Sequence, residues 1–329
     1  MNFIDSPYTD PALNLALEEF LLRRDNKTYM LLYVNKPAII VGKHQNAFRE
    51  VNLPFIERFG IPVIRRLTGG GTVYHDEGNL NFSFILNGKA GKMVDFGKYI
   101  EPVAGYIRSL GVDVETDKRH NLRIRGLKIS GNAEHIFKQR VLHHGTLLFS
   151  SRLDTLEEAI KPAPGTFTDK AVESAGSRVT NISDYLNIKM TMTGFRKDLM
   201  RFCKYFFGEF SEVPETGIPR KDIGKLADEK YRTWDWNFGY SPDFVFGNKG
   251  SLQNRPCHIK VAVHKGIMTE VTLDGKGVKD FSYLCSMMKG VPYRKQDVAR
   301  ILRNNTGELA FVGIADEWLS LMFPETAQK

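Results

Sequence analysis

Residues 65–76 read RRLTGGGTVYHD, and this stretch decides how the rest of the chain is interpreted. Three consecutive glycines follow an apolar run that is typical of a strand. Without Cβ atoms they allow a tight turn and can present backbone N–H groups to an anion. A glycine triplet alone is more often a flexible hairpin turn. The preceding Arg65 and Arg66, which can hold phosphate or carboxylate oxygens as a fork, and the following Thr72 favour a phosphate-binding loop.

A second segment, residues 126–133, reads GLKISGNA. Strand alternation places Lys128 and Ser130 on the face opposite Ile129. Most lysines on strands are solvated charges, so Lys128 by itself is weak evidence for a site.

A third segment, residues 143–149, reads HHGTLLF. Adjacent strand residues point to opposite faces, and no third ligand has the spacing of a metal site. We therefore expect one of His143 and His144 to lie in the core or to line a substrate site.

Around these segments, strands and helices mix without a regular β-α-β alternation, which predicts an α+β fold. Asp10 and Pro11 are start signals for an amphipathic helix over residues 11–22. Apolar runs predict buried strands at residues 30–34, 38–41 and 62–66, and residues 81–85 alternate as a half-buried strand. Helical patterns follow at residues 53–59, 99–110, 156–160 and 193–207.

Glycine and proline break the pattern at residues 237–251. This break predicts a catalytic domain of residues 1–246 and a small α+β accessory domain of residues 247–329. Within the accessory domain, residues 258–273 read as a hairpin around Lys265-Gly266. Three helices are expected beyond it, at residues 282–288, 296–304 and 315–322.

The composition is that of a globular protein, with 42% hydrophobic and 26% charged residues among 329. The three cysteines form no C-x-x-C pair, and neither a leader pattern nor an apolar run of ~20 residues is present, so we expect a cytoplasmic protein that does not enter the membrane. The net charge of +8 suits acidic partners. Basic residues are spread along the chain, which argues against nucleic acid binding.

The order and the residue patterns of the three segments resemble those of the lipoate-protein ligase A family. Its blocks read R-R-x-[ST]-G-G-G-x-V-[FY]-H-D-x-G-N, then K-x-S-G-[SN]-A, then H-H-G-T-L-L. Further matches lie at residues 14–19, 41–46, 177–181 and 234–239. The resemblance covers residues 2–246 strongly and the remainder weakly. It implies a biotin/lipoate ligase-like catalytic domain with a mixed β-sheet and flanking helices.

The family implies a two-step reaction. Lipoate and ATP, with Mg²⁺, give lipoyl-AMP and pyrophosphate, and a lysine of an acceptor then displaces AMP. The implied acceptors are acidic: E2 lipoyl domains of 2-oxoacid dehydrogenases and the glycine cleavage H protein. We expect a monomer and no metal site made by protein ligands alone.

Carried over by position, the resemblance implies that Lys128 is catalytic and contacts both the lipoyl carbonyl and the α-phosphate. The nucleotide- and lipoate-binding residues would be Arg66, Gly71, Thr72, Val73, Tyr74 and Lys128. Residues expected nearby are Arg65, Thr68, Gly69, Gly70, His75, Asn79, Asn121, Ser130, Gly131, Ala133 and His144.

Two positions depart from the family pattern. Where the family reads R-N-D-[LI], this chain has Asn121, so an amide replaces an expected carboxylate. Gly176 stands where an additional arginine is more usual. Both changes bear on how the adenylate is formed and held.

Three alternatives remain. An octanoyl or lipoyl transferase of the same fold would need an activated cysteine, yet residues 1–202 contain none. Biotin-protein ligase has a glycine-rich block of different composition. A non-adenylating, acceptor-binding paralogue is supported only by Asn121 and Gly176.

Overall fold

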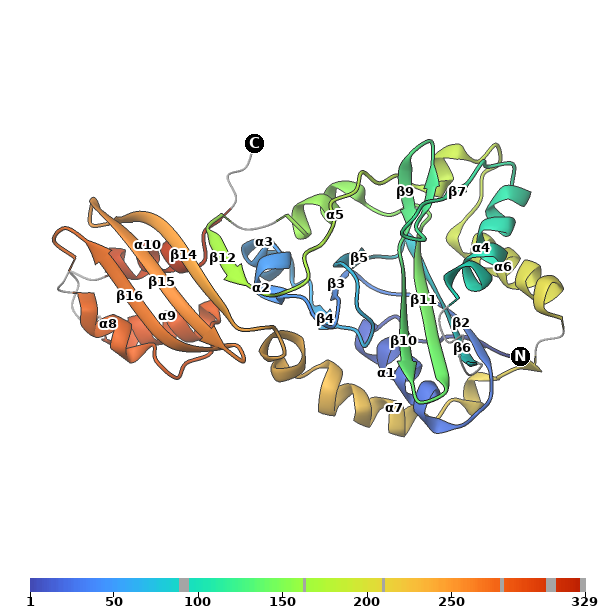
Figure 1. Cartoon of the computed structure of the whole chain (residues 1–329), viewed down its shortest axis with the longest axis horizontal. Helices are drawn as coiled ribbons and strands as arrows, with labels where there is room; N and C mark the ends of the chain where they lie inside the picture. The colour runs from blue at the N-terminus through green and yellow to red at the C-terminus, as the bar shows by residue number, and fades with distance from the viewer. Residues whose placement is uncertain (89–94, 162–163, 209–210, 279–280, 306–311, 326–329) are drawn as a thin grey trace. The chain divides into compact units, whose positions relative to one another are not determined.

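The computed structural model describes residues 1–88, 95–161, 164–208, 211–278, 281–305 and 312–325 (Figure 1). The chain divides into two compact units. The first comprises Met1–Lys43, Pro62–Glu157 and Ser174–Thr233, and the second comprises His44–Ile61, Glu158–Glu173 and Trp234–Lys329. The structural units are therefore interleaved along the chain, because two internal segments fold with the C-terminal residues. The division at residue 246 stays a prediction about function.

A six-stranded mixed sheet forms the centre of the first unit, which agrees with the expected α+β class. In sheet order the strands are β10 (Asn132–Phe137), β11 (Arg140–Leu148), β6 (Asn79–Asn87), β2 (Tyr29–Val34), β1 (Asn2–Asp5) and β13 (Ser211–Glu212). Strand β1 pairs in parallel with β2 and β13, whereas the pairs β2–β6, β6–β11 and β10–β11 are antiparallel.

Strand β6 differs from its expectation. The alternation of residues 81–85 predicted one solvated face, but all residues of β6 except the last are buried. Its polar side chains face buried polar partners instead of water: Ser83 bonds to Glu18, and Asn81 accepts from Asn79. The alternation of polar and apolar residues in β6 therefore corresponds to two buried faces of the strand, one polar and one apolar.

Helices of the first unit cover this sheet. Asp10 caps α1 (Pro11–Arg24) by accepting from the amide of Ala12, and Pro11 lies in the first turn, as predicted. Helices α4 (Phe96–Ser109) and α6 (Met192–Phe207) pack against each other (Figure 1). They bury Val103 and Leu199 in the main core. The remaining helical segments are α7 (Arg220–Leu226), η1 (Ile182–Tyr185), η2 (Glu215–Gly217) and η3 (Ala227–Tyr231), and α5 (Leu153–Ala159) runs across the boundary between the units.

Two small sheets of the first unit carry the sequence motifs. In one, β3 (Ala38–Val41) lies between β4 (Val63–Arg65) and β5 (Val73–His75), so the glycine-rich stretch connects its outer strands. In the other, β7 (Glu115–Thr116), β8 (Leu122–Ile124) and β9 (Leu127–Ser130) form a meander that carries Lys128.

The second unit contains a four-stranded antiparallel sheet of β12 (Thr166–Asp169), β14 (Phe244–Leu252), β15 (Arg255–His264) and β16 (Ile267–Gly275). Alternate residues of β15, such as Ile259 and Val261, share a core with Leu302 and Trp318 of the helices. The helical segments of this unit are α2 (Ala47–Glu50), α3 (Leu53–Phe59), η4 (Asp235–Gly239), α8 (Ser282–Met287), α9 (Lys295–Asn305) and α10 (Val312–Met322).

The predicted hairpin around Lys265-Gly266 is confirmed, but the predicted break at residues 237–251 is wrong over its second half, which is strand β14. Gly250 lies inside this strand, and a Cβ added to it would come within 2.6 Å of the Leu321 side chain. The glycine therefore serves close packing and does not mark a linker. Throughout the described ranges, no helix is both long enough and apolar enough to cross a membrane.

Candidate active site

The glycine-rich loop between β4 and β5 is organised by the side chain of Arg66. Its Nη2 donates to the carbonyl oxygens of Gly69 and Gly71, each at 2.7 Å, and its Nη1 donates to Ile40 at 3.0 Å. Gly70 has a φ of +86°, a conformation that glycine adopts without steric cost. The loop is thus wrapped around a buried guanidinium group.

The expected anion fork of Arg65 and Arg66 is not what the structure shows. Arg65 is buried and donates to the carbonyl oxygens of Gly42 and Lys43. Arg66 uses four of its five N–H groups within the protein, and burial lowers its pKa to about 10. Because a buried cation requires hydrogen-bond acceptors, both arginines bind the backbone that they support.

A chain of buried hydrogen bonds runs behind the loop. Nε of Arg66 donates to the Thr68 hydroxyl at 2.9 Å, and that hydroxyl lies 2.8 Å from Nε2 of His144. Nδ1 of His144 lies 3.0 Å from a carboxylate oxygen of Glu18. Helix α1, the glycine-rich loop and strand β11 are therefore tied together by side chains.

Glu18 is the buried acceptor at the end of this chain. It also accepts from the hydroxyl groups of Tyr33, at 2.8 Å, and Ser83. Burial raises its pKa, but the interactions with His144, Ser83 and Tyr33 outweigh burial and hold the pKa below the usual value. Glu18 is consequently a carboxylate in the interior of the first unit.

His75 and Asn79 bring unpaired polar atoms into the same region. Asn35 Nδ2 lies 2.9 Å from Nδ1 of His75, so the ring proton belongs on Nε2, which is buried and bonds to none of the described residues. Oδ1 of Asn79 is also buried without a partner among them. Burial, followed by the charges of Arg66 and His144, lowers the pKa of His75 to about 3. Buried polar atoms without partners mark places where a ligand atom or water completes the bonding.

Lys128 is half-buried on β9 beside Gly131. Its Nζ lies 3.2 Å from the point that a Cβ at Gly131 would occupy. Burial lowers the pKa of Lys128, nearby Asp117 raises it, and Arg123 and Arg66 lower it further. The ammonium group is therefore close to several other cations, which favours an anionic ligand at this position.

Backbone pairing positions the strand of Lys128. Its amide donates to Arg178 at 2.9 Å, and its carbonyl accepts from Thr180 at 3.1 Å. Ser130 is buried on the same strand, and Ala133 lies opposite His144 in the β10–β11 register.

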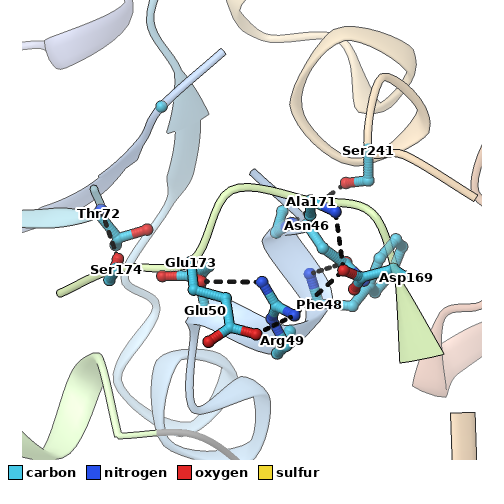
Figure 2. A network of polar contacts seen from close by, with 12 residues as sticks. Asn46, Phe48, Arg49, Glu50, Thr72, Asp169, Ala171, Glu173, Ser174 and Ser241 are labelled. Carbon is cyan, nitrogen blue, oxygen red and sulfur yellow. Dashed lines mark hydrogen bonds and ion pairs between the residues drawn. The ribbon is translucent and has the colours of Figure 1, made fainter. Parts of the chain in front are cut away.

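Asn121 and Gly176, the two positions that depart from the family pattern, have different surroundings in the structure. The amide of Asn121 donates to both carboxylate oxygens of Asp117, at 3.1 and 3.0 Å. Gly176 has no atom within 4 Å of the place where its Cβ would be. The neighbouring Ser174 accepts from the Thr72 amide at 2.9 Å, as Figure 2 shows.

In the second unit, Arg49 holds the residues that precede Ser174 in sequence (Figure 2). Its Nη1 lies 3.1 Å from Asp169 and 3.0 Å from Glu173. Asn46 donates to the other carboxylate oxygen of Asp169 at 2.9 Å. These bonds hold Asp169 and Glu173 in place, and the chain continues from Glu173 to Ser174.

The two histidines of β11 face opposite sides, as predicted. His143 pairs with Glu134 at 2.9 Å and stacks near Phe82 and Tyr99 in the apolar core, whereas His144 belongs to the Glu18 network. In the parts of the chain that the structure describes, no three His, Cys, Asp or Glu side chains are arranged to hold a metal ion.

Sequence reasoning missed four residues of this region. Helix α1 buries ten of its 14 residues, so the predicted amphipathic character is wrong: the helix is enclosed on nearly all sides. Glu18 is a charged residue in this buried helix and needs a partner, and this conflict was the available signal. The other three, which local patterns did not distinguish from ordinary strand and loop residues, are Tyr33, Ser83 and Asp117.

The model of the lipoyl protein ligase A/B catalytic domain matches residues 10–204. The chain is 37% identical to lipoate-protein ligase LplJ of Bacillus subtilis (strain 168) over 332 residues, which covers 98% of this chain and 100% of that protein. It is 39% identical to lipoate-protein ligase 1 of Staphylococcus aureus (strain Mu50) over 298 residues, with coverages of 88% and 90%.

Solved structures give a consistent result. A Thermoplasma acidophilum protein described as a lipoate protein ligase, with bound lipoic acid, is 27% identical with a TM-score of 0.61, covering 72% of this chain and 98% of that one. A lipoate-protein ligase A bound with ATP is 26% identical with a TM-score of 0.61, covering 73% and 98%. A bi-partite lipoate protein ligase, described with its E2 lipoyl domain from T. acidophilum, is 26% identical with a TM-score of 0.61, covering 73% and 96%.

Proposed function

This chain belongs to the lipoyl protein ligase A/B family, and we infer from that membership that it is an ATP-dependent lipoate-protein ligase. In the first step, a carboxylate oxygen of lipoate attacks the α-phosphorus of ATP, pyrophosphate leaves, and lipoyl-AMP forms. In the second step, the ε-amino group of an acceptor lysine attacks the lipoyl carbonyl and AMP leaves. The similar structures solved with lipoic acid and with ATP support both substrates.

The observation that carries the proposal for the site is the position of Lys128. Its ammonium group is half-buried, with Asp117 as the opposing charge and Arg123, Arg66 and Arg119 as further cations, so the excess of positive charge favours an anionic ligand. We assign it to the lipoyl carboxylate, whose negative charge it can hold in place, and to the α-phosphate, where negative charge develops as the bond forms. A fixed cation at that point lowers the barrier without having to reorganise.

The glycine-rich loop supplies the rest of the proposed binding site. The segment from Gly71 to Tyr74 lines the nucleotide and acyl-phosphate position, and Arg66 acts through the shape of the loop. Nε2 of His75 and Oδ1 of Asn79, which bond to none of the residues that the structure describes, are available to a ligand or to water. Residues 1–246 are the proposed adenylating domain and residues 247–329 the accessory domain.

Mg²⁺ is expected to accompany ATP. The side chains near Lys128 fit an ion that is held mainly by phosphate oxygens and water. Both carboxylate oxygens of Asp117 already accept N–H bonds, and the described residues contain no cluster of three metal-binding side chains. When bound, the ion would neutralise phosphate charge. The work of the chain's own residues is to position the lipoyl carboxylate and the α-phosphate.

The proposed acceptors are acidic lipoyl domains of E2 subunits and the glycine cleavage H protein. One similar ligase has been described together with an E2 lipoyl domain, and the net charge of +8 favours association with an acidic surface. A cytoplasmic location stays a prediction, supported by three cysteines that are buried and unpaired.

The function is tested by pyrophosphate release from ATP with lipoate, octanoate or biotin as the acid. We expect release with lipoate, and lipoylation of an E2 lipoyl domain or an H protein when either is added. Octanoate shows how strictly the acyl chain is recognised. Release with biotin alone would place the chain with a different class of ligase, and lipoyl-AMP-dependent transfer without release from ATP would identify a non-adenylating enzyme.

A further inference from the structure

Strand β10 lies at the edge of the six-stranded sheet and forms a hairpin with β11 (Figure 1). The amide of Thr146 donates to the carbonyl of Gly131 at 3.0 Å. In an antiparallel ladder only every second residue bonds to the neighbouring strand, so from Gly131 onward the bonding residues alternate. The backbone N–H and C=O groups of Glu134 and Ile136 therefore point away from β11.

The outer side of β10 is accessible to solvent. Glu134 as a whole is partly exposed although its side chain is only 4% exposed, so its accessible part is the backbone. Ile136 is 43% exposed. Among the residues that the structure describes, the ladder with β11 is the only pairing of this strand. An exposed strand edge without proline is a ready template for a further strand.

Cations border the hairpin end of this edge. The guanidinium group of Arg23 lies 4.6 Å from the centre of the Phe137 ring, and the ammonium group of Lys138 lies 5.5 Å from it. Arg23 and Lys230 share one carboxylate, that of Glu19, at 2.8 and 2.7 Å, so this group has an excess of positive charge. The second unit contains nearly equal numbers of basic and acidic residues, and the net positive charge therefore belongs to the first unit.

The other end of β10 begins at the proposed site. Nζ of Lys128 lies 3.2 Å from the Cβ position of Gly131, and β10 starts at the following residue. A strand rises ~3.3 Å per residue, so a partner strand paired along β10 would extend about 20 Å between Lys128 and the cations of the hairpin. A lysine at the end of that partner strand would then lie beside the acyl phosphate.

We infer that the outer edge of β10 is the docking site of the acceptor domain, which adds an acidic, extended strand to the sheet and so delivers its target lysine to Lys128. Main-chain bonds to Glu134 and Ile136 supply the pairing, and Arg23 and Lys138 favour acidic side chains on the added strand. This inference rests on the proposed function, because the acceptor of the second step supplies the strand.

The first test compares two substitutions at one position. Ile136→Pro removes the outward N–H and leaves the bonds to β11 in place, whereas Ile136→Ala removes the side chain and keeps the N–H. We expect Ile136→Pro to raise KM for an E2 lipoyl domain at least about tenfold, and Ile136→Ala to raise it less than about threefold. Pyrophosphate release with free lipoate should stay within about twofold of the parent in both, because adenylation does not use this edge.

The second test removes charge. Arg23→Gln with Lys138→Glu should raise KM for the lipoyl domain about fivefold at low salt and less at high salt, because the attraction is screened. Lys249→Glu with Lys260→Gln, which makes the same charge change at exposed positions of β14 and β15, is the matched control and should keep the parental KM. All measurements use the full-length protein, and thermal unfolding verifies that each variant is folded.

A parental KM in folded Ile136→Pro, or an equal rise in Ile136→Pro and Ile136→Ala, would overturn the inference, as would equal effects of the two charge variants. Should Ile136→Pro not fold, hydrogen exchange of the parent protein decides. The amides of Glu134 and Ile136 should then become protected by an excess of lipoyl domain whose target lysine is replaced by arginine, and unchanged exchange rejects the inference. Failure of the proposed function has a different signature, because the parent protein itself would release no pyrophosphate with lipoate.

Discussion

The hydroxyl of Thr68 lies 2.8 Å from Nε2 of His144, although the two residues are 76 positions apart. The same hydroxyl accepts from Nε of Arg66, so one oxygen joins the glycine-rich loop to strand β11. His144 in turn bonds to Glu18 on helix α1. The shape of the loop therefore depends on contacts that are distant in sequence.

Thr68→Val removes this oxygen and keeps the shape of the side chain. His144 Nε2 and Arg66 Nε would each lose a partner in a buried position, which costs about 1–3 kcal/mol per group. We expect a lower free energy of unfolding and a several-fold lower kcat/KM for ATP, because Arg66 then holds the loop less firmly. Urea unfolding and steady-state kinetics measure the two effects. Thr116→Val on exposed strand β7 is the control and should change stability by about 0.5 kcal/mol or less.

Urea unfolding of the first unit should be followed by far-ultraviolet circular dichroism. All three tryptophans lie at position 234 or beyond, within the second unit, so tryptophan fluorescence reports mainly that unit.

Lys128→Ala should lower the rate of lipoyl-AMP formation ~10²–10³-fold, because it removes a fixed positive charge from the position where negative charge develops. Circular dichroism and the unfolding midpoint should stay near parental values, since a half-buried lysine among arginines contributes little to stability. Lys118→Ala, an exposed lysine close by in sequence, is the matched control. Near-parental pyrophosphate release by Lys128→Ala would remove this residue from the mechanism.

Acid should destabilise the first unit partly through His75. Its pKa is lowered to about 3 from 6.5, so between these values the unfolded chain binds a proton that the folded chain does not. Stability therefore falls as the pH falls through this window, by up to about 1.4 kcal/mol per unit. His75→Asn should flatten the dependence of the unfolding free energy between pH 6 and 4, even if the variant is less stable at pH 7. A slope in His75→Asn equal to that of the parent protein would refute the assignment.

Helices and strands with strong local signals were predictable from the sequence. The first helix has a capping aspartate and a proline in its first turn. Helix α3 ends at Gly60, whose φ of +63° lets its backbone N–H bond to carbonyl oxygens of the last turn. Strand β14 was missed because Gly247 and Gly250 are typical of a linker. The glycine at position 250 packs against Leu321 of α10, which is more than seventy positions away in the sequence.

The part that the candidate site residues play stays a prediction, whereas their positions and bonds can be compared with what the sequence suggested. The motif residues do gather on β5, β9 and β11 and on the loop between β4 and β5, but the direction of a guanidinium group is set by acceptors that the sequence does not reveal. For that reason Arg66 was expected to face an anion and instead binds Gly69 and Gly71. Asp117 was missed because an aspartate before a turn gives no sequence signal of the bonds that its carboxylate accepts.

Salt should weaken acceptor modification more than adenylation. Steering between a basic ligase with a net charge of +8 and an acidic domain is screened over ~8–10 Å at physiological ionic strength. Transfer to an E2 lipoyl domain should therefore slow between about 50 and 300 mM salt, and pyrophosphate release with free lipoate should change less. Equal sensitivity of the two steps would show that the net charge does not serve the acceptor.

The cysteines distinguish a ligase from a transferase that works through a thioester. Such a transferase needs a thiolate at its site, but burial raises the pKa of Cys203 to about 12 and that of Cys285 to about 11, and it also raises the pKa of Cys257. Cys203 is enclosed in the apolar core with Leu199. All three thiols are accordingly assigned to packing.

A variant with Cys203→Ala, Cys257→Ser and Cys285→Ala should therefore keep ATP-dependent lipoylation. Removing buried sulfur atoms leaves small cavities, so a modest loss of stability is expected and the assay belongs at a temperature where circular dichroism shows a folded protein. The parent protein, incubated with an acyl donor such as octanoyl acceptor domain but without ATP, should transfer nothing and form no hydroxylamine-sensitive adduct. A folded cysteine-free variant that has lost transfer, or an acyl thioester trapped on the parent protein, would establish the transferase instead. Substrate binding would then have to activate a thiol whose pKa is raised by burial.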